Sequence, residues 1–349
     1  MKKALIALAV LGLTGGAAVA QSSVTLFGVI DADMKYVKTG DLKLKKLDSA
    51  GLNTSRIGVR GTEDLGGGLK AGFWLESQVD TDTGLGGGGG AFWGRRATVS
   101  LSGDFGEVRL GRNKTVSRLH LEDFDPTAFT GLGSVSAVYS NLGSGNGTSF
   151  GRADNLASYS LPTNLGGFYG GVDVSAGEGV GTNKGQSVRL GYKAGPLHVS
   201  GAYASTSNAA DNSKFKLASV GAAYDFGADL AGIRPSLSYT QTKYLGREQK
   251  IWTASVTAPL GQGQLWGAYT NASANAAAET AVTGYTAIGD AKLFAAGYIY
   301  YLSKRTALYT TVSQIKNNGA AKFIVSGAPA ATAGGQKSSG FDVGVRHSF

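Results

Sequence analysis

The sequence predicts an all-β protein, a 16-stranded antiparallel transmembrane β-barrel. Three features of the 349-residue chain predict this fold. Segment after segment alternates apolar and polar residues with a period of two, which is the pattern of a strand with one apolar face. The connections between these segments are alternately short and long. After residue 20, no apolar run approaches the ~20 residues that a membrane helix needs.

The composition narrows the class of protein. Charged residues make up 16% of the chain, below the ~25% of a typical soluble domain. Cysteine is absent, which excludes disulfide scaffolds, thiolate metal sites and cysteine nucleophiles. The three histidines, His120, His198 and His347, leave little room for histidine-based catalysis or metal binding. The composition therefore favours a β-structured membrane protein over an enzyme with a metal or thiol centre.

The first twenty residues predict a secretory signal peptide. Lys2 and Lys3 form a positively charged start, residues 4–13 form an apolar core, and Ala18-Val19-Ala20 provides a cleavage motif. The apolar core is too short to anchor the chain in a membrane. We therefore expect a signal peptide over residues 1–20 and a transmembrane barrel over residues 21–349.

The first strand shows the alternation clearly. Val24, Leu26 and Ile30 share one face, whereas Asp31 and Asp33 share the other. At about 3.3 Å per residue, segments of this length suit tilted membrane strands of ~9–11 residues. The same pattern predicts strands at 24–38, 55–63, 69–79, 92–103, 105–112, 155–162, 168–177, 186–194, 197–206, 216–226, 233–244, 250–259, 264–271, 292–302, 306–316 and 340–349.

The connections predict how the strands are arranged. The short ones cover 64–68, 162–167, 194–196, 227–232, 260–263 and 303–305. The long ones cover 39–54, 80–91, 113–154, 272–291 and 317–339. Short turns at one end and long loops at the other are typical of an outer-membrane barrel, in which the first strand pairs with the last. A soluble β-sandwich or lectin is the alternative, but the polar rows here are rich in charged residues and suit a water-filled interior better.

Several motifs are long enough to indicate a family. They are SVTLFG at 23–28, SRIGVRGTEDLGGGLKA at 55–71, GEVRLGR at 106–112, LSKRT at 302–306 and the terminal Phe349. In these motifs the chain resembles the trimeric general porins of Gram-negative outer membranes, most closely the anion-selective type from β-proteobacteria. The resemblance implies a homotrimer embedded in outer-membrane lipid, a third extracellular loop folded inward to constrict the pore, and a C-terminal Phe349 that the barrel assembly machinery reads.

The stretch 113–154 would be this constriction loop. A connection of about this length in a compact protein is more often functional than not, although a mobile surface loop is the alternative. Its acidic residues Glu122, Asp123 and Asp125 could face basic residues across the constriction. The stretch departs from the Pro-Glu-Phe-Phe-Gly motif of many general porins, which leaves the shape of the constriction open.

Arginines on the polar rows predict the ion preference. By alternation, Arg56, Arg60, Arg96 and Arg109 face the interior. Arginine stays charged at any working pH, and rings of basic side chains are how anion pores select. The alternative for each arginine is that its side chain is solvated and paired with an acidic neighbour. In that case it would not affect the flux of ions through the pore.

The resemblance implies an arginine cluster at the constriction and carries it over to Arg56, Arg95 and Arg152. The alternation conflicts with this assignment at one position, because it places Arg96 inside the barrel and Arg95 outside. Either a β-bulge near the start of the strand re-aims Arg95, or Arg96 takes its role. Both alternatives stay open.

We therefore expect a channel for passive diffusion of small hydrophilic solutes and ions, with a preference for anions. We expect no catalytic residues, metal or cofactor; the G-x-S-x-G match at 147–151 lacks its strand–turn–helix context. The basic residues form no compact cluster with aromatics, which argues against nucleic-acid binding. A weakly selective or cation-preferring porin, and a poorly conducting adhesion or structural barrel, are the alternatives.

Overall fold

The computed structural model describes residues 23–349, except 87–89, 145–149, 178–183, 209–212 and 282–285. The expected signal peptide and most of the match at 147–151 lie outside the described residues. The strands are β1 (Ser23–Thr39), β2 (Leu42–Ser49), β3 (Arg56–Gly66), β4 (Leu69–Gln78), β5 (Arg96–Gly103), β6 (Gly106–Lys114), β7 (Arg152–Ser160), β8 (Phe168–Ser175), β9 (Gly185–Ala194), β10 (Leu197–Ser207), β11 (Lys214–Tyr224), β12 (Arg234–Tyr244), β13 (Arg247–Leu260), β14 (Gly263–Ala274), β15 (Ala291–Tyr301), β16 (Thr306–Asn317) and β17 (Ser338–Ser348).

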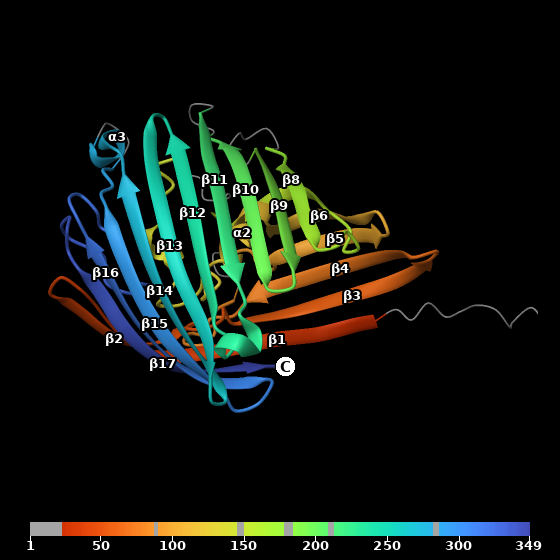
Figure 1. The fold of residues 1–349 in the computed structure, drawn as a ribbon, viewed down its shortest axis with the longest axis horizontal. Helices are drawn as coiled ribbons and strands as arrows, with labels where there is room; N and C mark the ends of the chain where they lie inside the picture. The colour runs from red at the N-terminus through yellow and green to blue at the C-terminus, as the bar shows by residue number, and fades with distance from the viewer. Residues whose placement is uncertain (1–22, 87–89, 145–149, 178–183, 209–212, 282–285) are drawn as a thin grey trace, which may run out of the picture.

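The strands form one antiparallel sheet that closes on itself (Figure 1). One edge of β1 pairs with β17 over Val29–Thr39. The other edge pairs with β3 over Ser23–Val29 and with β2 over Ala32–Thr39. β2 and β3 lie end to end along the same edge of β1, so together they occupy one strand position in the wall. The seventeen strands therefore fill sixteen strand positions around the barrel. The predicted 16-stranded antiparallel barrel is confirmed: the first and last strands pair, and among the described strands β2 is paired along β1 only.

Three expectations about the strands differ from the structure. The stretch 39–54, expected as a loop, contains β2, which continues the wall beyond β3 because β1 is seventeen residues long. Residues 92–95, expected in a strand, precede β5, which begins at Arg96. β7 begins at Arg152, three residues earlier than expected, because Lys114 and Arg152 extend the pairing of β6 with β7.

The wall has two different faces. On β1, the outward Leu26 and Met34 are 60% and 68% exposed, whereas the alternating Asp31 and Asp33 are buried on the inner side. Exposed apolar side chains likewise alternate with buried serines and threonines on the other strands, for example Val312 against Thr311 on β16. This is the distribution expected of a wall with hydrocarbon outside and polar groups within.

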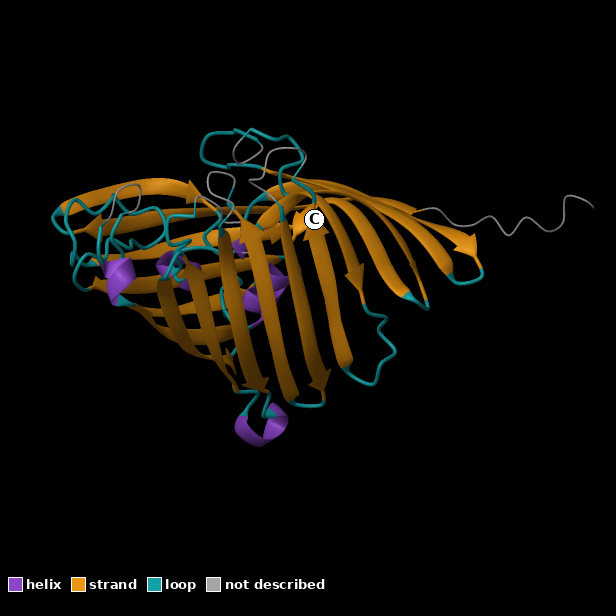
Figure 2. Cartoon of the chain, turned by 90° about the horizontal axis from the view of Figure 1, so that it is seen from above, coloured by secondary structure: helices purple, strands orange, loops and turns teal. Residues whose placement is uncertain are grey.

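The connection between β6 and β7 packs against the inner face of the wall. It contains the helix α2 (Val116–Asp123) and the short helix η1 (Val135–Val138). Leu132 and Val138 are fully buried in a cluster with inward-facing residues of β13 to β16. Figure 1 shows α2 behind β9 to β12, and Figure 2 shows it among the strands rather than outside them. In the described part of the chain, no helix is long and apolar enough to cross a membrane.

Candidate functional site in the barrel interior

Three arginines gather next to one carboxylate on the inner wall, and two of them approach it directly. The Arg95 Nε lies 2.6 Å from Glu76 Oε1, and the Arg56 Nε lies 3.8 Å from the same oxygen. Arg152 joins them because its Nε donates a hydrogen bond of 2.7 Å to the carbonyl of Arg95. β3, β4 and β7 position Arg56, Glu76 and Arg152, and the segment before β5 positions Arg95. Glu76 is therefore the carboxylate nearest to these arginines, and the charge of Glu122 also acts on Arg56 and Arg152.

Arg95 and Arg96 both reach the interior, by different routes. Arg96 is the first residue of β5 and pairs in register with Glu76, so it belongs to the inner row. Arg95 lies just before the strand, where the alternation of the strand does not constrain its side chain. The pairing of β4 with β5 is regular, and the nearby irregularity lies in β6, at Gly111–Asn113. Gly111 has a φ of +118°, and a Cβ there would overlap the carbonyl of Ala97, so this bulge needs glycine.

A second group of basic residues stacks on an aromatic ring. The guanidinium carbons of Arg60 and Arg96 lie 4.9 and 4.3 Å from the ring centre of Trp74. The Trp74 Nε1 donates to Glu76 at 3.2 Å, which joins this stack to the carboxylate described above. Cation–π contacts hold the two guanidinium planes in place without neutralising their charge.

Arg109 is paired locally. Its Nη2 lies 2.5 Å from Glu107 Oε2, two residues away on the same row of β6. Both residues lie near the turn that precedes β6. Arg109 is thus placed nearer the short-turn end of the barrel, with its charge offset by a neighbouring carboxylate.

The acidic residues of α2 contact basic residues other than the arginines around Glu76. Glu122 lies 2.7 Å from the Lys114 Nζ and 2.6 Å from the Arg118 Nε. Asp123 pairs with Arg189 on β9 and lies 3.4 Å from His198 Nε2 on β10. Burial raises the pKa of Asp123, and the charge of Arg189 opposes that rise.

The position of Asp125 differs from the expectation that it faces the arginines. Its carboxylate accepts hydrogen bonds from the backbone N–H groups of Thr127, Phe129 and Val135 and from the Thr127 hydroxyl. All these donors belong to its own loop. A buried carboxylate satisfied in this way holds the loop together and is not available to a solute.

Several basic residues of the interior were not among the predicted site residues. Arg118 lies in a stretch expected as a loop, although its spacing of four residues from Glu122 is the helical spacing of an ion pair. Arg189 alternates with the outward Val188 and Leu190, so the strand pattern alone could have identified it. Lys114 lies next to the bulge, where the alternation of β6 breaks.

His120 fixes α2 to the wall. Its Nδ1 lies 2.7 Å from Ser200 Oγ on β10, and its Nε2 lies 2.9 Å from Ser219 Oγ on β11. The side chain is fully buried. Burial and the nearby positive charge of Arg189 lower the pKa of His120 to about 3, so the ring is neutral at physiological pH. The residue is therefore part of the scaffold.

Phe349 closes the barrel at its seam. Its backbone N–H donates to the carbonyl of Gly28 at 3.1 Å, and the N–H of Gly28 donates back at 3.2 Å. The Phe349 ring lies over Gly28 so closely that a Cβ there would overlap it. The C-terminal residue thus continues the pairing of β1 with β17 and covers the join with an aromatic ring.

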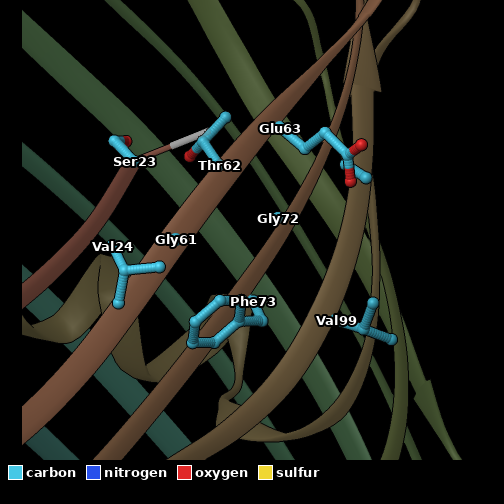
Figure 3. A pocket seen from close by; sticks show the side chains of 9 residues that line it. Ser23, Val24, Gly61, Thr62, Glu63, Gly72, Phe73 and Val99 are labelled. Atoms are coloured by element: carbon cyan, nitrogen blue, oxygen red, sulfur yellow. The ribbon is translucent and has the colours of Figure 1, made fainter. Parts of the chain in front are cut away.

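A hollow on the outer face of the wall is lined by none of the basic residues described above. Figure 3 shows Val24, Phe73 and Val99 around it, with Phe73 beside Gly61. Its lining is mainly apolar and belongs to the outward rows of β1, β3, β4 and β5. The charged interior is therefore the candidate functional site.

Comparisons with known proteins identify the family and the fold. The sequence profile of the Gram-negative porin family matches residues 7–320. The chain is 39% identical to outer membrane porin protein 32 of Delftia acidovorans and 30% identical to an outer membrane porin protein of Bordetella pertussis, in both cases over 100% of each chain. Its fold is similar to the solved structure titled as the anion-selective porin from Comamonas acidovorans, with a TM-score of 0.82, 34% identity, and coverage of 94% of this chain and 100% of that one.

Proposed function

The chain belongs to the family of Gram-negative porins and is an outer-membrane porin, and we propose that its channel passes small hydrophilic solutes passively and prefers anions. The observation that carries the proposal is the grouping of Arg56, Arg95 and Arg152 next to the carboxylate of Glu76, where the positive charges outnumber those of Glu76 and Glu122. The similarity to an anion-selective porin supports it. Small carboxylates and phosphate fit the proposed preference, and the function is diffusion rather than catalysis.

The physical basis is a fixed positive field in confined water. Two unit charges ~4 Å apart interact by about 4 kcal/mol at an effective dielectric of ~20, against about 1 kcal/mol in bulk water. In a narrow water column inside a low-dielectric wall, the interaction energy between charges approaches the larger of these two values. A permeating anion is stabilised there and a cation is destabilised, so the sign of the excess charge sets the preference.

The connection between β6 and β7 would narrow the channel next to this cluster. Its contacts with the inner face, from His120 to β10 and β11 and from Leu132 and Val138 to the inner rows of β13 to β16, support this placement. Arg96 and Arg60 would extend the positive surface, and Arg109 would add little because Glu107 offsets it. Glu122 and Asp123 would reduce the net charge of the constriction without cancelling the cluster, since each already neutralises another basic residue.

The expected assembly is a homotrimer delivered to the membrane through Phe349. The resemblance to trimeric porins supports the trimer. The place of Phe349 at the closing seam suits a residue that the barrel assembly machinery would read before the first and last strands pair. The signal peptide over residues 1–20 belongs to the same proposal.

The test is the reversal potential of single channels in planar bilayers under a salt gradient. Wild-type channels should give the sign of an anion-preferring pore, and the double variant R56Q/R152Q should reduce the anion-to-cation permeability ratio about fivefold or more, the factor that ~1 kcal/mol provides. The control K304Q/R305Q also removes two positive charges, at a short turn, and should leave the ratio unchanged. A cation-preferring wild type, or equal ratios for R56Q/R152Q and K304Q/R305Q, would refute the proposal.

A further inference from the structure

The segment that joins β2 to β3 binds two arginines from strands on opposite sides of β1. On β3, the Arg56 Nη1 donates a hydrogen bond of 3.2 Å to the carbonyl of Thr54. On β17, the Arg346 Nη1 donates a hydrogen bond of 3.4 Å to Asn53 Oδ1. β3 and β17 pair with the two edges of β1 (Figure 1). Two successive residues of the segment therefore bring together guanidinium groups from the third and the last strand.

Asp31 on β1 fixes the position of this segment. Its carboxylate is fully buried and also accepts a hydrogen bond from the Tyr309 hydroxyl. The other donors are three successive backbone N–H groups, those of Gly51, Leu52 and Asn53, at 3.1, 3.1 and 2.6 Å. A segment bonded at three successive residues has little freedom to move. The side-chain oxygen of Asn53 is therefore held at a fixed place on the inner wall.

Arg346 keeps its positive charge available. In the described part of the chain it forms no ion pair, and its buried Nε has no hydrogen-bond partner. Asp31 is its register partner on β1, but the Asp31 carboxylate is engaged by the donors named above. By contrast, Arg56 lies 3.8 Å from Glu76. The amide oxygen of Asn53 carries no net charge, so it orients the Arg346 guanidinium without neutralising it.

Arg346 adds to the positive group next to Glu76. Its charge is close enough to that of Arg56 for the two to repel each other. Such a repulsion lowers the stability of the fold, so stability does not account for the placement of the two arginines. With Arg95 and Arg152 on the other side of Arg56, the positive row extends across β1 to the last strand of the barrel.

We propose that Arg346 is a further residue that determines the ion preference, and that Asn53 positions it. An ion that passes Arg56 also meets the charge of Arg346, which is fixed before the ion arrives. The inference rests on the proposed function, because it assigns one more residue to the same selection of anions. The contact spans 293 positions, and no local pattern of the sequence indicates it.

The test measures reversal potentials in planar bilayers at ~0.1 M salt, where charges within ~10 Å are felt. R346Q should lower the anion-to-cation permeability ratio about twofold or more, because a unit charge ~8 Å from an ion changes its local concentration about twofold even at the dielectric of bulk water. R346K keeps the charge and should stay close to the wild-type ratio. R305Q removes one exposed positive charge at a short turn and should leave the ratio unchanged.

Two results of this comparison would overturn the proposal. Equal ratios for R346Q and R305Q would show that ions do not respond to the charge of Arg346. A ratio for R346K as low as that of R346Q would show that the charge is not what matters at this position.

A second pair of variants neutralises Arg346 without changing it. N53D places a carboxylate where Arg346 now bonds an amide oxygen, so it should lower the ratio as R346Q does. Q262E adds an equal negative charge at an exposed short turn and should leave the ratio unchanged. A wild-type ratio for N53D would overturn the contact between Asn53 and Arg346.

The unfolding temperature separates this role from a structural one. R346Q should unfold at about the wild-type temperature, because the loss of repulsion from Arg56 opposes the loss of the bond to Asn53. A lower unfolding temperature with an unchanged ratio would assign Arg346 to the scaffold instead. A cation-preferring wild type would refute the proposed function; R346Q should then still shift the ratio further toward cations, and the absence of that shift would overturn the role of Arg346.

Discussion

Glu76 sets how much positive charge the interior offers to a solute. Its carboxylate is engaged by Arg95, by Arg56 and by the indole N–H of Trp74. Glu76 orients the guanidinium groups of Arg56 and Arg95. Because it supplies only one negative charge, the ordered group still has an excess of positive charge. Order and excess charge together are what a selective site needs, because a fixed group stabilises an ion without first reorganising.

At the same scale, the assignments from sequence were good for strand residues and poor for loop partners. Arg56 lies 3.8 Å from Glu76 and Arg152 bonds the carbonyl of Arg95, and their role at a constriction stays a prediction. The pairing of Asp123 with Arg189 spans 66 positions and depends on how α2 is laid against β9. No local sequence pattern indicates that contact. The charged residues could therefore be predicted from the sequence, but not the residues with which they form ion pairs.

The first prediction concerns His120 and acid. Because its folded-state pKa is about 3 against an ordinary 6.5, the neutral ring stabilises the fold fully above pH 6.5. The free energy of unfolding decreases as the pH falls from 6.5 toward 3, because the imidazole binds a proton in the unfolded chain but stays neutral in the folded chain. The free energy of unfolding, measured in urea between pH 7.5 and 4, should fall more steeply for wild type than for H120N, by up to about 1.4 kcal/mol per pH unit. Parallel curves would show that the ring is not held neutral.

At the scale of the element, the alternation of apolar and polar residues predicted all sixteen strand positions in the wall. It did not predict the exact residues at which the strands begin and end. β2 was missed because its dense lysines resemble a solvated loop, whereas the length of β1 offers it an edge to pair with. The break of β6 at Gly111 depends on the close approach of Ala97 on the next strand. Pairing partners and close approaches are properties of the assembled sheet, so a single segment does not reveal them.

The second prediction concerns the seam between β1 and β17. Gly28→Ala places a methyl group where the Phe349 ring lies, so the ring must move and the seam must loosen. Overpacking of this kind costs about 1–3 kcal/mol. The measurement is the free energy of unfolding from lipid vesicles, together with the yield of folded barrel.

A matched control exists for the seam variant. Gly201 on β10 has its nearest neighbour for an added Cβ at 3.5 Å, an ordinary contact. G201A should therefore fold with wild-type yield and change stability by a few tenths of a kcal/mol at most. If G28A matched G201A in both measurements, the Phe349 ring would contribute nothing to closure.

At the scale of the whole molecule, the connection between β6 and β7 touches the wall at several separate places. His120 holds α2 to β10 and β11. Gly131 packs against the carbonyl of Gly51, next to the segment that Asp31 holds through the N–H groups of Gly51, Leu52 and Asn53. Gly133 packs against Trp266 on β14. The segment is thus attached to the inner face of the wall over many strands, from β10 and β11 to β14 and the residues that follow β2.

The last prediction uses this attachment to test whether the segment narrows the channel. Gly131 has a φ of +76°, and an added Cβ would overlap the backbone of Gly51, so G131A must detach the segment there. Gly166 has a φ of +62° with nothing within 4 Å of an added Cβ, so G166A carries the same backbone strain without the overlap. Single-channel recordings should show higher conductance and weaker anion preference for G131A, and wild-type values for G166A, with equal yields of folded barrel. Because detachment widens the path past Arg56 and Arg152, selectivity must fall as conductance rises; a change in only one of them would mean that the arginines and the segment act at different depths of the channel.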